Sequence, residues 1–140
     1  MSRLTDTEAL ELLRSRDLLG VGARAHEVRE RLIPGELVTF IVDRNINYTN
    51  VCIAGCRFCA FHCAPGASEA YVLPRAVIHE KIQETVDLGG TGILMQGGLH
   101  PDLDITWYED LFRSVKERFD ITIHSLSPPE IVHIAKVSGL

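Results

Sequence analysis

Residues 92–98, Gly-Ile-Leu-Met-Gln-Gly-Gly, form a short apolar run that ends in two glycines. A run of this length predicts a buried strand. The apolar positions of residues 78–86 before it, and of residues 105–119 after it, recur with the spacing of one helical face. Residues 121–124 then return to a strand pattern. Strand and helix therefore alternate, and this alternation predicts an α/β fold whose parallel strands are joined by right-handed crossovers.

The whole chain divides into an N-terminal helical segment, residues 1–36, and an α/β region, residues 37–140. Residues 5–32 show helical spacing that two glycines interrupt. The β-branched apolar run 37–42 predicts the first strand, and residues 43–73 predict a long loop of the kind that tends to be functional. Three strand–helix units do not close a barrel, and the sequence ends where a further strand is due. We therefore expect the 140 residues to be a fragment.

Composition and charge exclude several classes of protein. Hydrophobic residues make up 46% and charged residues 24%, which is ordinary for a globular protein. The net charge of -5 argues against a sequence-independent nucleic-acid binder, which needs a basic face. Apolar runs are too short to cross a membrane, and the first residues lack the apolar core of a signal peptide. We expect a cytoplasmic protein with no nucleic-acid or membrane partner.

All cysteines fall within residues 52–63: Cys52, Cys56, Cys59 and Cys63. A disulfide framework spreads its cysteines along a chain, so this crowding indicates metal binding or redox chemistry. The spacing Cys-x3-Cys-x2-Cys of the first three can hold three irons of a [4Fe-4S] cluster and leave the fourth iron without a protein ligand. An open coordination position is a place for chemistry, as it is in catalytic zinc sites. Cys63 is then a spare thiol.

Two other sites suit four neighbouring thiols. A structural zinc site is one, although such sites usually draw two cysteine pairs from separate turns. A ferredoxin-like electron carrier is the other, but its Cys-x2-Cys-x2-Cys-x3-Cys-Pro run differs from the spacing here and needs a further cysteine elsewhere. Neither alternative fits the spacing as well as a three-thiolate cluster does.

The cysteine spacing, with the aromatic Phe58 before the third cysteine, resembles the radical S-adenosylmethionine (SAM) superfamily. Three more segments resemble one branch of it: residues 44–52 (Arg-Asn-Ile-Asn-Tyr-Thr-Asn-Val-Cys), 95–101 (Met-Gln-Gly-Gly-Leu-His-Pro) and 124–130 (His-Ser-Leu-Ser-Pro-Pro-Glu). That branch contains the dehypoxanthine futalosine cyclases of menaquinone biosynthesis, the aminofutalosine synthases and the synthases of the deazaflavin chromophore. The likeness extends over residues 37–140 and is strongest to the cyclases.

The resemblance implies the N-terminal portion of a radical SAM (βα) TIM-type barrel, with a [4Fe-4S] cluster and SAM as cofactors. The first three cysteines match the cluster ligands, and SAM would chelate the remaining iron. Phe58 matches the position that lies against the adenine of SAM. Gln96, Gly97 and Gly98 match the segment that hydrogen-bonds the SAM amino group. Leu99 stands where the superfamily usually has an acidic residue, which makes this segment a variant of the pattern.

Polar residues that follow the predicted strands are candidates for substrate contact, because reacting groups of such barrels sit at the carboxyl ends of strands. His100 and His124 are the catalytic candidates, each with an equally good structural explanation as a turn or core histidine. The candidates for substrate binding are Arg44, Asn47, Ser127 and Glu130. Arg44 also suits a salt bridge within the barrel. Ser127 and Glu130 also match a capping box that opens a helix with proline at its first position.

The resemblance implies an oxidoreductase that cyclises dehypoxanthine futalosine. Cleavage of SAM would give a radical that takes a ribose hydrogen, and the sugar radical would add to the aromatic ring. The implied partners are dehypoxanthine futalosine as a small-molecule substrate and a reductant such as a ferredoxin or flavodoxin. Two alternatives remain: a deazaflavin-chromophore synthase of the same branch, and a non-enzymatic iron-sulfur or zinc module. We expect the 140 residues alone to be inactive, because the later strands complete the pockets.

Overall fold

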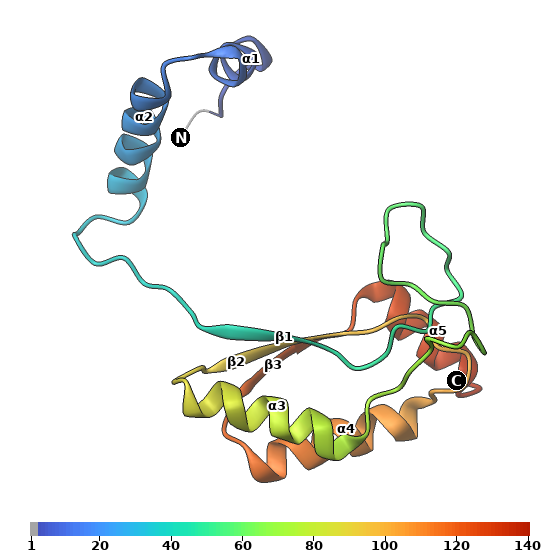
Figure 1. Cartoon of the computed structure of the whole chain (residues 1–140). Coiled ribbons are helices and arrows are strands. Elements are labelled where there is room, and N and C mark those ends of the chain that lie inside the picture. The colour runs from blue at the N-terminus through green and yellow to red at the C-terminus, as the bar shows by residue number, and fades with distance from the viewer. Residues whose placement is uncertain (1–2) are drawn as a thin grey trace. The chain divides into compact units, whose positions relative to one another are not determined.

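The computed structural model describes residues 3–140, which form two compact units. The first unit ends at Thr39, and the second extends from Phe40 to Leu140 (Figure 1). Among residues 3–140, no helix is long and apolar enough to cross a membrane.

The first unit consists of two helices, α1 (Asp6–Arg14) and α2 (Leu18–Leu32). Asp17 caps α2, because its carboxylate accepts the backbone N–H of Gly20 at 2.9 Å. The prediction that the two glycines interrupt the helix is wrong, since α2 runs through both Gly20 and Gly22. The helical conformation is interrupted instead just before α2, where the Asp17 carboxylate accepts a hydrogen bond from a free backbone N–H of the first turn of α2.

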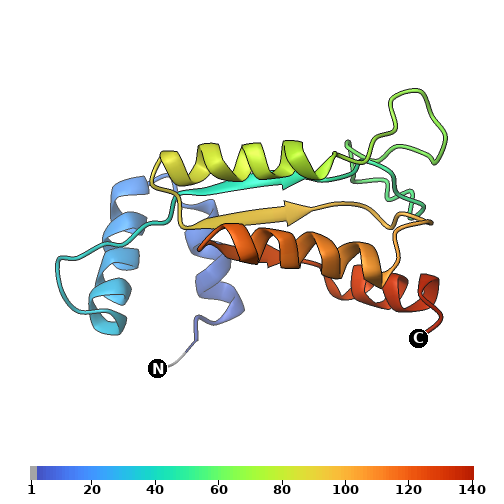
Figure 2. The ribbon, with the colours of Figure 1, turned by 90° about the horizontal axis from the view of Figure 1, so that it is seen from below.

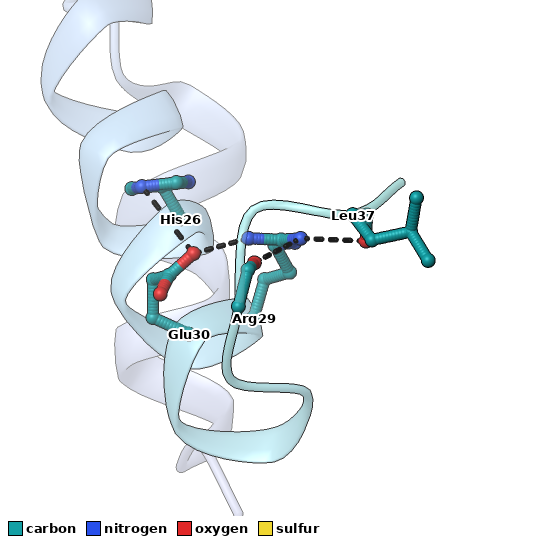
Figure 3. Close-up of polar contacts among 5 residues, drawn as sticks. His26, Arg29, Glu30 and Leu37 are labelled. Carbon is teal, nitrogen blue, oxygen red and sulfur yellow. Dashed lines mark hydrogen bonds and ion pairs between the residues drawn. The ribbon is translucent and has the colours of Figure 1, made fainter. Parts of the chain in front are cut away.

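Arg29 fixes the turn that follows α2 (Figure 3). Its guanidinium donates to the carbonyl oxygens of Gly35 at 2.9 Å and Leu37 at 3.3 Å. The same group pairs with the carboxylate of Glu30, which also lies 3.8 Å from the His26 ring. One side chain thus ties the segment after α2 back onto the helix.

The second unit is a parallel three-stranded sheet with helices between its strands. The strands, in the sheet order β1-β2-β3, are β1 (Asp43–Asn47), β2 (Gly92–Gln96) and β3 (Thr122–Ser125). The helices are α3 (Arg75–Asp87), α4 (Ile105–Arg118) and α5 (Pro128–Val137). Figures 1 and 2 show α3 and α4 side by side along one face of the sheet, with the long loop after β1 at the carboxyl ends of the strands. The predicted alternation of strand and helix is confirmed.

The first strand begins later than predicted. Pairing of β1 with β2 starts at Asp43 opposite Gly92, so the predicted strand at residues 37–42 is wrong. Because β2 begins at Gly92, opposite Asp43, it does not extend far enough to pair with residues 37–42. That apolar run therefore has no partner in the three-stranded sheet. Its side chains are exposed, as at Phe40, which is 85% accessible. Hydrogen-bonding partners rather than apolar character therefore set where the strand starts.

The core of the second unit lies between the sheet and the helices α3 and α4. Its fully buried aliphatic side chains are Ile46, Ile78, Ile82, Ile93, Met95, Leu111 and Val115. Those in the strands lie at alternate positions, on the face of the sheet toward the helices. Those in the helices lie on the apolar face that the sequence predicts. Burying side chains of this size stabilises the unit by roughly 1.5–3 kcal/mol each.

Alternation along the strands gives the opposite face of the sheet a different character. Ile46 and Ile93 point into the core, so their neighbours point away from it. The residues on this second face, which we call the polar face, are Asp43, Asn45, Asn47, Gly92, Leu94, Gln96, Thr122 and His124. Four of them carry an amide or an imidazole.

Candidate functional site

A cleft of about 620 Å³ lies at the carboxyl ends of β1 and β2. The loop after β1, the segment after β2 and the start of α5 all contribute to its walls. Most of the site residues predicted from the sequence line it, namely Asn47, Cys52, Phe58, Cys59, Gln96, Gly97, Gly98, Ser127 and Glu130. The fold therefore brings residues far apart in the sequence to one place.

Arg44 does not join this group. It is the second residue of β1 rather than part of the loop after it, so the expectation that it follows the first strand is wrong. Its guanidinium lies against α3, where it donates to the carbonyl oxygen of Lys81 at 3.0 Å and pairs with the carboxylate of Glu84. Arg44 thus makes the salt bridge that was its structural explanation.

The two histidine candidates also lie outside the residues that line the cleft. Nδ1 of His100 accepts the backbone N–H of Asp102 at 3.1 Å, and the His100 carbonyl oxygen is 2.8 Å from Nε2 of His133. Burial lowers the pKa of His100. His124 is exposed on the polar face, opposite Leu94 of the neighbouring strand.

The cysteine loop is closed at its base. The Cys52 N–H donates to the carbonyl oxygen of Cys63 at 3.0 Å, and the Cys63 N–H donates to that of Asn50 at 2.8 Å. Cys63 is buried there and does not line the cleft. Burial raises the pKa of its thiol, with the Glu69 carboxylate adding to the shift. A thiol that stays protonated is a poor metal ligand, which agrees with its interpretation as a spare cysteine.

A second set of hydrogen bonds holds the segment after the cysteine loop. The Asn50 amide donates to the carbonyl oxygen of Glu69 at 2.9 Å and accepts the N–H of Tyr71 at 2.9 Å. The Thr49 hydroxyl donates to the carbonyl oxygen of Tyr71 at 2.6 Å. We call Thr49 and Asn50 the loop clamp, because they join the start of the cysteine loop to the chain that follows it.

Two glycines after β2 allow the backbone to approach the loop closely. A Cβ atom at Gly97 would overlap the ring of Tyr48, and one at Gly98 would lie 2.5 Å from the Cβ of Cys52. The Leu99 N–H donates to Sγ of Cys52 at 3.3 Å. The segment after β2 is therefore packed directly against the first cysteine of the loop.

The donor set of the loop suits an iron-sulfur cluster. Cys52 and Cys59 line the cleft, while the exposed Cys56 lies one turn away, with its carbonyl oxygen accepting the Cys59 N–H at 3.1 Å. Within residues 3–140 no three His, Cys, Asp or Glu side chains are gathered closely enough to hold a metal ion. The three thiols fit a cluster by their chemistry and their spacing in the sequence, and Gly98 lets the segment after β2 approach the first of them closely.

Glu130 forms the far wall of the cleft and is held by three donors. Its carboxylate accepts the Ser127 N–H at 2.7 Å, the Ser127 hydroxyl at 2.6 Å and the Tyr48 hydroxyl at 3.3 Å. The predicted capping box at the start of α5 is confirmed. Burial raises the pKa of Tyr48, so its hydroxyl stays protonated and able to donate.

A protein-family profile described as the radical SAM superfamily matches residues 46–137. The chain belongs to the radical SAM superfamily. The matched range contains the cysteine loop, the glycines after β2 and Glu130. Members of this superfamily use a [4Fe-4S] cluster and SAM, and the cysteine-rich loop fits a cluster-binding motif.

Curated relatives agree with this radical SAM assignment. The chain is 50% identical over 139 residues to a cyclic dehypoxanthine futalosine synthase of Halalkalibacterium halodurans, covering 99% of the chain and 38% of the relative. It is 44% identical over 140 residues to a synthase of the same name from Streptomyces coelicolor, covering 97% of the chain and 35% of the relative. An FO synthase of Streptomyces avermitilis is 44% identical over 142 residues, which cover 99% of the chain and 16% of that protein. The chain thus spans a little over a third of the length of the first two relatives.

A solved structure of another enzyme supports the fold. The crystal structure of methylornithine synthase matches 98% of this chain and 42% of that one, with a TM-score of 0.69 and 19% sequence identity. The predicted fold class, the N-terminal portion of a radical SAM barrel, is confirmed.

The sequence did not indicate every residue that lines the cleft. Asn45 lines the cleft but was hidden, because a first strand at residues 37–42 places it in a loop. Residues 43–47 contain a single apolar residue, Ile46, so the sequence carries no clear alternation that could have revealed the strand and placed Asn45. Tyr48, which supports Glu130, carries no signal in the sequence beyond its place in the Asn-Tyr-Thr-Asn segment.

Proposed function

We propose that this protein is a radical SAM oxidoreductase that cyclises dehypoxanthine futalosine to cyclic dehypoxanthine futalosine in the futalosine route to menaquinone. The observation that carries the proposal is the 50% identity, over nearly the whole chain, to a relative of that name. The cleft adds support, because thiols, a glycine pair and a fixed carboxylate surround a space large enough for a small molecule.

The cofactors would lie on the side of the cleft that the cysteine loop forms. Cys52, Cys56 and Cys59 would hold the cluster, while residues 96–98 and Phe58 would bind SAM. When bound, the cluster and SAM supply a one-electron reductive cleavage that yields a carbon radical able to take a hydrogen atom from the substrate. Phe58 is 99% exposed, so its ring is free to cover an adenine.

The chain's own residues would bind, orient and shield the substrate. Asn47 and Ser127 line the cleft and offer donors and acceptors to sugar hydroxyls. Glu130 would act as an acceptor in a fixed position, because three donors restrain its carboxylate. His100 and His124 do not line the cleft, and either would contact only a substrate that extends beyond it. Excluding water from this cleft protects a radical from side reactions.

The test is turnover by the anaerobically reconstituted full-length protein with SAM, a reductant such as reduced flavodoxin or ferredoxin, and dehypoxanthine futalosine. We expect methionine, 5′-deoxyadenosine and the cyclised product. Consumption of SAM with the substrate left intact would contradict the proposal. We expect the 140 residues alone to give little turnover, because three strands do not close a barrel. Cyclised product from them alone would contradict that expectation.

A deazaflavin-chromophore synthase is the second candidate, because an FO synthase matches 99% of this chain at 44% identity. Supplying tyrosine with a diaminouracil in the same assay separates the two activities. A non-enzymatic zinc module would show instead one zinc per chain and no iron or sulfide. We place the protein in the cytoplasm, where crowded thiols stay reduced.

A further inference from the structure

Two tyrosine hydroxyl groups lie behind the carboxylate of Glu130, in the core of the second unit. Tyr48 is fully buried and Tyr108 is 4% exposed. The Tyr48 hydroxyl oxygen lies 3.3 Å from Oε1 of Glu130 and 3.4 Å from the Tyr108 hydroxyl oxygen. Glu130 itself is half-buried and lines the cleft beside the cysteine loop. The Tyr48 phenol thus joins the core to the wall of the cleft.

The hydroxyl protons of both tyrosines can be directed toward Glu130. A carboxylate only accepts hydrogen bonds, whereas each phenol has one proton to donate. Burial raises the pKa of both tyrosines, so both stay protonated. The Tyr48 proton goes to Glu130, the charged acceptor, and the Tyr48 oxygen can then accept the proton of Tyr108. In this arrangement Tyr108 strengthens the bond that Tyr48 makes to the carboxylate.

The two oxygens of the Glu130 carboxylate have different partners. Oε2 accepts the N–H and the hydroxyl of Ser127, which completes the capping box of α5. Oε1 accepts from Tyr48, which follows β1 and is distant in the sequence. The capping box therefore holds one oxygen at the start of the helix, and Tyr48 fixes the direction of the other.

The Tyr48 ring is itself held on several sides. Its centroid lies 5.5 Å from that of Trp107 and 5.9 Å from that of Tyr108. A Cβ atom at Gly97 would overlap the ring carbon that bears the hydroxyl. The Tyr48 N–H donates to the carbonyl oxygen of Gln96 at 3.0 Å. The phenol is thus fixed against the segment after β2, which lines the same cleft.

The chain enters α5 through a strained residue. Leu126 has a φ of 58°, in the left-handed region that costs a residue with a Cβ about 1–2 kcal/mol. Strain of this kind persists where the surrounding contacts determine the conformation, and it is frequent at functional sites. Leu126 leads directly into Ser127, and both Ser127 and Glu130 line the cleft. The fold therefore keeps this turn at a cost in backbone energy.

We propose that Tyr48 is a positioning residue for substrate binding: its hydroxyl orients the Glu130 carboxylate, which accepts a hydrogen bond from a sugar hydroxyl of the substrate. A carboxylate that is already held loses little freedom when a ligand binds, so this preorganisation increases the affinity. A sugar hydroxyl also accepts, and the amides of Asn47 and Gln96 in the same cleft can donate to it. The inference rests on the proposed function in taking the sugar to be the ribose of dehypoxanthine futalosine.

The experiment measures binding without turnover, in the full-length protein that carries its cluster and SAM but receives no reductant. Dehypoxanthine futalosine is titrated into it in a calorimeter. Tyr48→Phe removes only the hydroxyl and keeps the ring that packs against Trp107. We expect its dissociation constant for the substrate to rise about tenfold, because a hydrogen bond to a charged group is lost. Iron content and the dissociation constant of SAM should stay as in the parent protein.

A double variant tests whether Tyr48 acts through Glu130. Glu130→Ala should also weaken substrate binding. Tyr48→Phe added to it should cause a smaller further loss than in the parent protein, because the hydroxyl then has no carboxylate to orient. Two effects that simply multiply would overturn the inference, since Tyr48 would then act independently of Glu130. If Glu130→Ala loses its cluster, Glu130→Gln, which keeps a capping-box side chain, takes its place with the same expectation.

Thr85→Val is the matched control for the loss of a buried hydroxyl. Thr85 is buried, its hydroxyl donates to the Lys81 carbonyl oxygen at 2.8 Å, and it does not line the cleft. This variant should bind the substrate like the parent protein. Equal dissociation constants for Tyr48→Phe and the parent protein would overturn the inference. Weaker binding of SAM in Tyr48→Phe would overturn it as well, because Glu130 would then serve the cofactor.

A second ligand separates this inference from the proposed function. A diaminouracil that carries a ribityl chain is titrated into the same proteins. If the parent protein binds it in place of dehypoxanthine futalosine, and Tyr48→Phe weakens that binding, the proposed function fails and the inference stands. A parent protein that binds neither ligand would contradict both.

Discussion

The backbone at Gly98 lies against Cys52 so closely that a Cβ atom at position 98 would stand 2.5 Å from the Cβ of that cysteine. Real side chains do not approach this closely, and the carbonyl oxygen of Val51 blocks the same space. The next residue, Leu99, donates its N–H to the Cys52 sulfur at 3.3 Å. The segment after β2 therefore positions the first thiol of the cysteine loop.

Gly98→Ala should displace Cys52 and reduce cluster binding. The added methyl group meets backbone and Cβ atoms that cannot rotate away, which costs about 1–3 kcal/mol. We expect less iron and sulfide per chain after anaerobic reconstitution than in the parent protein. Gly22→Ala is the control, because nothing lies within 4 Å of a Cβ at that position. Equal iron in both variants would show that Gly98 does not position the thiol.

The four cysteines should separate into two classes on substitution. We expect Cys52→Ser, Cys56→Ser and Cys59→Ser each to abolish the [4Fe-4S] signal, because a cluster held by three thiolates loses an iron ligand. Cys63→Ser should keep the cluster, since that buried thiol has a raised pKa and lies outside the cleft. The measurement is iron content together with EPR of the reduced protein. A cluster lost only in Cys63→Ser would assign the ligands differently.

Local patterns in the sequence were enough to predict most of the fold. The helical stripes at residues 78–86 and 105–119, and the glycine-bounded strand at 92–96, all appear in the structure as α3, α4 and β2. The first strand was misplaced because β-branched residues at 37–42 favour a strand without saying where its partner begins. Register depends on the neighbouring strand, which a local pattern does not contain.

For the candidate site as well, the sequence predicts some features and not others. Cysteine spacing and the Gln-Gly-Gly segment predict which residues meet, because both follow strand ends. The shift of β1 changes the position of Arg44, which lies inside the strand on the face toward α3, whereas Asn45 and Asn47 on the other face line the cleft. The loop clamp depends on bonds across about twenty residues, as between Asn50 and Tyr71. Such contacts leave no periodic signal in the sequence.

Asn50→Ala should loosen the segment that follows the cysteine loop. Both polar groups of the Asn50 amide bind backbone at 2.9 Å, and alanine removes both bonds. We expect a loss of about 1–2 kcal/mol in the free energy of unfolding and faster amide exchange at Tyr71. Ser68→Ala is the comparison, because its hydroxyl bonds only to the exposed Glu69 carboxylate beside it. Exchange at Tyr71 that stays as slow as in the parent protein would exclude a role for the clamp.

The stability of the second unit should fall as the pH is lowered through the range in which histidine titrates. His79 lies between α3 and α4, with its Nε2 at 3.1 Å from the Ser114 hydroxyl. Burial lowers the pKa of His79, and the charges of Arg118 and Arg75 add to the shift. The unfolded chain, with a histidine pKa of about 6.5, therefore binds more protons than the folded chain as the pH falls below that value. Protonation then favours unfolding, and the stabilisation is lost on going down through the folded pKa.

His79→Gln tests this by keeping a hydrogen-bonding side chain and removing the titration. We expect urea unfolding of the parent protein to show a lower free energy at pH 5.5 than at pH 7.5, both values chosen to bracket an ordinary histidine pKa of about 6.5. The difference should be smaller in the variant. It should not vanish, because burial also lowers the pKa of His100 and gives a change of the same sign. An identical pH dependence in the two proteins would mean that His79 is protonated as readily in the folded chain as in the unfolded one.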